Sequence, residues 1–143
     1  MGGGGLFLFG WVEKKMYICI LGGEVPRDVN IIKSAHRVME QQQVIERITE
    51  LGRQILPKGA SLWLYGSRAR GDARPDSDYD LLILLDKEKI TSRDYDLYTY
   101  PLSELGIDLD AEINPSMYVR KDWTTWSYAP FNHEVETDKK VLL

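Results

Sequence analysis

The chain has one cysteine, no long apolar run and no surplus of positive charge. Each of these shortages argues against a class of protein. A single thiol, Cys19, can form neither an internal disulfide nor a cysteine-rich metal site, which favours a reducing cytoplasm. No stretch approaches the roughly 18 apolar residues of a membrane span, so we expect no membrane partner. The net charge of −4 disfavours extended nucleic acid as a partner, because proteins that grip it carry a basic face.

The first 38 residues differ in pattern from the rest. Four glycines precede two short apolar runs, Leu6–Trp11 and Met16–Leu21, which could form a hairpin or a poorly ordered tail. From Met39 onward the pattern is regular and long enough for one domain. We therefore interpret residues 1–38 as an N-terminal extension, disordered or not native, and residues 39–143 as the functional domain. A chain that starts at Met39 is expected to fold and function alone.

Hydrophobic periodicity after Met39 predicts both helices and strands. An amphipathic helix is expected to end before Pro57 and Gly59. The later elements are expected to be strands at Ser61–Tyr65, Tyr79–Leu85 and Ile107–Ile113, and helices at Thr91–Leu105 (bent or ended by Pro101), at Arg120–Trp126, and from Phe131 to near Val141. The predicted fold class is α/β: a small twisted mixed sheet with helices packed on one face and the active site at an edge.

Residues 64–83 are the most informative stretch. A strand leads into Gly66-Ser67, where glycine allows the backbone to approach a ligand and a turn into a helix presents N–H groups to a phosphate. Ser67 adds a hydroxyl, and Arg68 and Arg70 add positive charge in an otherwise acidic chain. These four residues form the predicted phosphate site, with one arginine facing the ligand and the other facing solvent.

Asp78 and Asp80 begin the strand that follows. Strand residues two apart face the same way, about 6.5–7 Å apart, so the two carboxylates can share a hard cation or bridge a pair of cations. Such pairs are also common as solvated strand ends. The Gly-Ser and Arg-Gly elements before this pair favour metal binding, and magnesium suits a site made of carboxylates plus substrate phosphates.

One ordered set of residues resembles the signature of the minimal nucleotidyltransferases, within the polymerase-β-like superfamily: Gly66, Ser67, Arg70, Gly71, Ser77, Asp78 and Asp80. The resemblance covers residues 39–143. It implies the polymerase-β-like fold and a two-metal Mg²⁺ site on Asp78 and Asp80. The implied reaction is transfer of a nucleoside monophosphate, most plausibly AMP from ATP, to a hydroxyl.

The resemblance also implies a third carboxylate on a neighbouring strand. Asp108, Asp110 and Glu112 share one face if Ile107–Ile113 is a strand, although they could equally be its wet face. Glu112 opens a Glu-Ile-Asn-Pro segment similar to one found in some relatives. Glu112 is therefore favoured as the third metal ligand and proton acceptor, with Asp110 a close second.

Residues 39–143 leave no room for a separate acceptor-binding domain, so a partner or a second copy is expected to complete the site. Many minimal nucleotidyltransferases pair with a helical HEPN-type protein as toxin–antitoxin modules, which implies a small helical partner whose tyrosine could be the acceptor. The alternative is a binding module, an antitoxin that neutralises its partner by contact alone. The intact Gly66-Ser67 turn and the carboxylates Asp78 and Asp80 favour the enzyme, because binding alone places no demand on them.

Overall fold

The computed structural model describes residues 29–143, with backbone only for Val29 and residues 31–39. The chain divides into two compact units, residues 1–42 and 43–143, and helix α2 (Val29–Ile55) crosses their boundary. The helix begins at Val29, well before Met39, the residue from which the sequence predicted regular structure. The expected hairpin of Leu6–Trp11 and Met16–Leu21 lies outside the described residues, as does Cys19.

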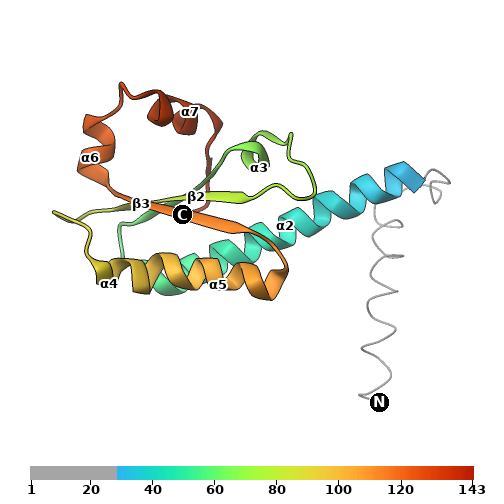
Figure 1. Ribbon diagram of the computed structural model, residues 1–143, viewed down its shortest axis with the longest axis horizontal. Helices are drawn as coiled ribbons and strands as arrows, with labels where there is room; N and C mark the ends of the chain where they lie inside the picture. The colour runs from blue at the N-terminus through green and yellow to red at the C-terminus, as the bar shows by residue number, and fades with distance from the viewer. Residues whose placement is uncertain (1–28) are drawn as a thin grey trace, which may run out of the picture. The chain divides into compact units, whose positions relative to one another are not determined.

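A mixed sheet forms the centre of the second unit, as expected (Figure 1). It has four strands in the order β3-β2-β1-β4. Strand β1 (Ser61–Tyr65) is antiparallel to both β2 (Tyr79–Leu85) and β4 (Lys140–Val141), whereas β2 is parallel to β3 (Ile113–Val119). The buried run Leu81–Leu85 makes β2 an inner strand that is covered on both faces. The bounds of β1 and β2 are those predicted. The short edge strand β4 was not predicted.

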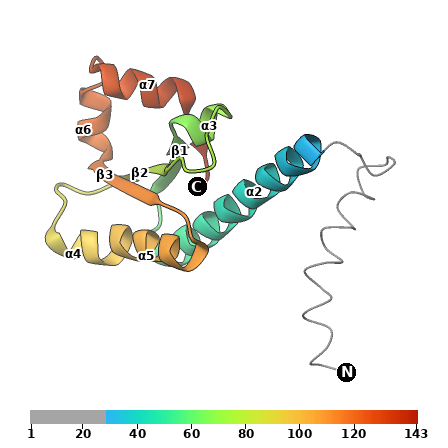
Figure 2. The same ribbon diagram turned by 45° about the vertical axis from the view of Figure 1, so that its right-hand side comes forward.

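Helices cover both faces of the sheet, not one as expected. The later part of α2 and helix α5 (Tyr100–Leu109) pack on one face, where Ile48, Leu64 and Leu102 are fully buried. Helices α6 (Arg120–Thr125) and α7 (Pro130–Asp138) cover the other face through Trp123 and Val135 (Figures 1 and 2). Helix α7 ends at Asp138, before the Val141 predicted as its end, because the chain then turns to pair β4 with β1.

Pro101 does not end the helix in which it lies. Helix α4 (Ser92–Asp94) continues through a π-helical segment, η1 (Tyr95–Thr99), directly into α5, where Pro101 occupies the first turn. Pro101 has no N–H to donate, and it follows a π-helical turn in which the N–H of Tyr100 bonds the carbonyl of Tyr95, so the hydrogen-bond ladder is already altered where that donor is missing. Among the helices between residues 29 and 143, none combines the length and apolar content of a membrane span.

The predicted strand Ile107–Ile113 is wrong. Residues 107–109 complete α5, Asp110 caps it in the left-handed conformation (φ 49°), and β3 begins only at Ile113. In this helix Leu105 and Leu109, four residues apart, face the core, whereas Ile107 is 81% exposed. Buried Gly106 permits the tight return, because a side chain there would collide with the carbonyl of Ala111. The three acidic residues 108, 110 and 112 therefore share no strand face.

Candidate active site

The turn after β1, which begins at Gly66, lies directly against Asp80 at the start of β2. Gly66 adopts φ 74° and ψ −158°, a region that essentially only glycine occupies. A Cβ at this position would lie 2.8 Å from Oδ2 of Asp80, and Tyr65 pairs with Asp80 across the two strands. The glycine is thus needed twice, once for its backbone angles and once for the carboxylate beside it. The turn and the carboxylate therefore form one local structure.

Asp78 and Asp80 form an acidic pair at the start of β2. Burial raises the pKa of the Asp80 carboxyl above its usual value, and the negative charge of Asp78 raises it further. Neither carboxylate forms an ion pair with any lysine or arginine whose side chain the structure describes. Ionising both carboxylates therefore concentrates negative charge that this part of the chain leaves unneutralised.

Strand β3 adds two polar side chains that sequence reasoning missed. Asn114 lies opposite Asp80 in the parallel register, and its Nδ2 donates to Oδ2 of Asp78 at 2.9 Å. Ser116 lies two residues further along β3 and is close to the side chain of Tyr65. Burial raises the pKa of the Tyr65 hydroxyl, the neighbouring Ser116 hydroxyl lowers it, and the negative charge of Asp80 raises it further. The parallel register that brings these residues together has no local sequence signal.

Arg68 is buried under the loop that precedes Asp78. Its side chain is on α3 (Ser67–Arg70), and the residue is only 7% exposed. Its Nε and Nη2 donate to the carbonyl of Ser77 at 3.0 and 2.8 Å, and Nη2 also donates to the carbonyl of Pro75 at 3.1 Å. The guanidinium lies 4.5 Å from the ring centroid of Tyr79. Arg68 therefore fastens this loop in place.

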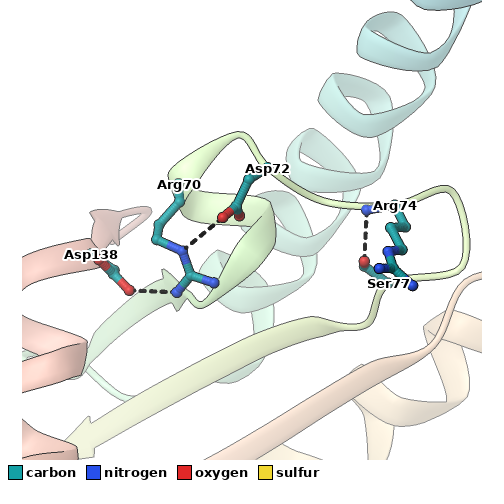
Figure 3. Close-up of polar contacts among 5 residues, drawn as sticks. All are labelled: Arg70, Asp72, Arg74, Ser77 and Asp138. Atoms are coloured by element: carbon teal, nitrogen blue, oxygen red, sulfur yellow. Dashed lines mark hydrogen bonds and ion pairs between the residues drawn. The ribbon is translucent and has the colours of Figure 1, made fainter.

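Arg70 lies at the surface, held by two carboxylates (Figure 3). Its Nε donates to Asp72 at 3.3 Å, and its Nη1 donates to Asp138 at the end of α7 at 2.7 Å. The loop that follows is closed by Ser77, whose Oγ accepts from the backbone N–H of Arg74 at 2.8 Å (Figure 3). Of the two arginines, Arg70 is the exposed one.

The two candidates for a third carboxylate occupy different places. Glu112 directly precedes β3, and its carbonyl accepts from the N–H of Tyr79 at 2.8 Å, so its backbone lies beside Asp78 and Asp80. Asp110 is the exposed cap of α5. Both line a shallow depression of about 490 Å³ at the end of α5, to which the acidic pair does not contribute. Among the side chains that the structure describes, no three from Asp, Glu, His or Cys converge as a metal site.

The acidic pair nevertheless fits Mg²⁺ by its chemistry. Magnesium is bound through one or two carboxylates together with waters and substrate phosphates, and needs no all-protein cage. Asp78 and Asp80 supply two such oxygen donors, and a divalent cation would compensate the burial and repulsion that raise the pKa of Asp80. The residues present therefore suit the metal that the sequence predicted.

Comparison with known proteins gives three findings. The model of a family described as nucleotidyltransferase domain matches residues 42–141. A bifunctional uridylyltransferase/uridylyl-removing enzyme of Streptomyces coelicolor is 40% identical over 65 residues, which are 44% of this chain but 8% of that protein. A crystal structure described as a toxin–antitoxin with AMP-PNP matches with a TM-score of 0.50 at 21% identity, over 69% of this chain and 72% of that one. The last likeness concerns the fold alone.

Proposed function

Because the chain belongs to the nucleotidyltransferase domain family, we propose that it transfers a nucleoside monophosphate, AMP from ATP above all, to a hydroxyl acceptor. One observation carries the proposal. The strained glycine turn that suits phosphates is in contact with the half-buried carboxylate that suits a metal, through Gly66 and Asp80. A site that handles a metal–triphosphate complex needs these two parts side by side.

We assign the chain's own residues to distinct tasks. Asp78 and Asp80 would hold Mg²⁺, which supplies orientation of the triphosphate and compensation of its charge. The backbone of Gly66 and the hydroxyl of Ser67 bind the phosphates. Arg70 is the arginine with access to the leaving pyrophosphate, because it is exposed on the last turn of α3. Arg68 acts indirectly, by holding the loop that delivers Asp78.

We propose Glu112, in preference to Asp110, as the third carboxylate. Its backbone is hydrogen-bonded to the start of β2, and Asn114, two residues later, already contacts Asp78. The side chain of Glu112 is exposed and is committed to no packing within the core. Asp110 instead ends a helix in a left-handed cap, one position before the chain turns toward β3.

The reaction balances without further reactants. The acceptor oxygen attacks the α-phosphorus, a new P–O bond forms, and the bond to the bridging oxygen of the β-phosphate breaks. Pyrophosphate leaves with that oxygen, and the hydroxyl proton passes to the third carboxylate. The residues of the turn contribute by binding and orienting the phosphates, and Arg70 offsets the charge that gathers on the leaving group.

We further propose that the acceptor hydroxyl is presented by a small helical partner protein or by a second copy of the chain, in the cytoplasm. Support comes from the structural neighbour, which is described as a toxin–antitoxin. The chain spans about 8% of the uridylyltransferase relative, so the activity of that whole protein carries no weight here.

The test compares two positions of the label in ATP. The protein is incubated with Mg²⁺, candidate partners and ATP labelled at either the α- or the γ-phosphate. Transfer of the α-label alone, lost in Asp78→Asn/Asp80→Asn and kept in the exposed-loop control Asp76→Asn, is the expected result. If the double variant neutralises its partner as well as the wild type does, and no label moves in either, the chain is a binding module instead.

A further inference from the structure

An aromatic side chain at the start of α7 lies close to the proposed reaction centre while remaining open to solvent. The ring of Phe131 stands edge-on to Tyr65, with centroids 5.8 Å apart and planes at 81°. It stands edge-on to Trp123 as well, at 5.8 Å and 83°. Although two rings support it, Phe131 is 39% exposed. Its orientation is therefore fixed by packing while part of its surface remains available to a ligand.

Tyr65 connects this ring to the phosphate turn. It is the last residue of β1, directly before Gly66, and it pairs with Asp80. The ring of Tyr65 contacts the ring of Phe131, and its backbone pairs with Asp80 between β1 and β2. Tyr65 therefore links the start of α7 to the acidic pair. Phe131 lies one ring away from the place where the phosphates would bind.

We propose that Phe131 is the surface on which the nucleobase of the bound nucleotide stacks. The inference rests on the proposed function and adds to it the part of the site that holds the base. Isolated exposed aromatic residues are common on protein surfaces. Phe131 differs from these because the rings of Tyr65 and Trp123 support its ring, and Tyr65 directly precedes the phosphate turn. Stacking is tolerant of base identity, since every base has a π-face, so purine and pyrimidine triphosphates should both bind.

The test separates the base from the phosphates. Affinity is measured by calorimetry in Mg²⁺ for ATP and for inorganic tripolyphosphate, which has no base. Phe131→Ala should weaken ATP binding about 5- to 150-fold, the usual range for loss of one base–aromatic stack, and leave tripolyphosphate binding unchanged. Phe131→Leu, which keeps an apolar contact, should give a smaller loss of ATP affinity. The matched control is Tyr100→Ala, which removes an aromatic side chain that is 62% exposed on α5, the helix on the opposite face of the sheet.

The binding measurements can overturn the stacking role in two ways. Unchanged ATP affinity in Phe131→Ala, or an equal loss for ATP and tripolyphosphate in Phe131→Leu, overturns the stacking role. If Phe131→Ala binds neither ligand, the Leu variant decides, because its side chain still fills the space between Tyr65 and Trp123. If the wild-type protein itself binds neither ATP nor tripolyphosphate, the proposed function fails, and the stacking role fails with it.

Discussion

Replacing Gly66 with alanine tests whether the turn and the carboxylate act as one unit. The change has two consequences that the structure separates. The backbone at φ 74° and ψ −158° is essentially closed to residues with a side chain, at a cost of about 1–3 kcal/mol. The new methyl group would also lie 2.8 Å from Oδ2 of Asp80, so the carboxylate has to move. We expect a moderate loss of stability and a near-complete loss of nucleotidyl transfer.

Gly71→Ala provides the matched control. Gly71 is also left-handed, at φ 86° and ψ 10°, but a Cβ there meets nothing within 4 Å. Its cost is backbone strain alone, again about 1–3 kcal/mol, with no displacement at the acidic pair. Urea unfolding gives the free energy of each variant, and α-label transfer from ATP gives the activity. Label transfer by folded Gly66→Ala at the rate of Gly71→Ala would refute the coupling between the turn and the carboxylate.

Three further predictions concern the parts around this unit. Arg68→Lys should destabilise the protein by about 2 kcal/mol in urea, because an ammonium cannot reproduce the forked donors to the carbonyls of Pro75 and Ser77; an unchanged midpoint would contradict the role. Hydrogen bonds from Lys87 and Thr91 lower the pKa of the Asp94 carboxyl. The stability that Asp94 adds is therefore fully present above the usual pKa of the unfolded chain, and it is lost as pH falls through the lower pKa of the folded protein. Asp94→Asn should thus lower the melting temperature at neutral pH and match the wild type in acid; a constant difference at all pH values would exclude this linkage. A chain starting at Met39 should keep the urea midpoint of the full chain, and aggregation of that shorter chain would count against the boundary.

The parts of the fold that sequence predicted have strong local signals. Strand β1 is a short apolar run that ends directly before Gly66, and β2 is a short apolar run that begins at Tyr79, after a polar loop. The alternation at Ile107–Ile113 was misleading because its first part belongs to the end of α5, where Leu109 packs on the core and Ile107 is exposed. The two-residue strand β4 exists only through its pairing with β1, which no local pattern records.

The residues of the motif could be predicted from the sequence, whereas the side chains that surround them in the folded site could not. The contact between Gly66 and Asp80 follows from residues of one sequence signature. Which arginine faces solvent depends on how α3 is oriented against the loop, and this orientation buries Arg68 and exposes Arg70. Asn114 reaches Asp78 only through the parallel register of β2 and β3, a tertiary feature that one sequence cannot specify.

The most direct test of a joint metal–phosphate centre is calorimetric binding of ATP with and without Mg²⁺, because it requires no acceptor. Asp80→Asn removes one charge while keeping the shape of the side chain, and Asp76→Asn removes a charge from the exposed loop nearby. We predict that the wild type and Asp76→Asn bind ATP only with Mg²⁺, and that Asp80→Asn loses this dependence together with at least tenfold in affinity, about 1.4 kcal/mol. Equal, Mg²⁺-dependent binding by Asp80→Asn would contradict the assignment of Asp80 to the metal.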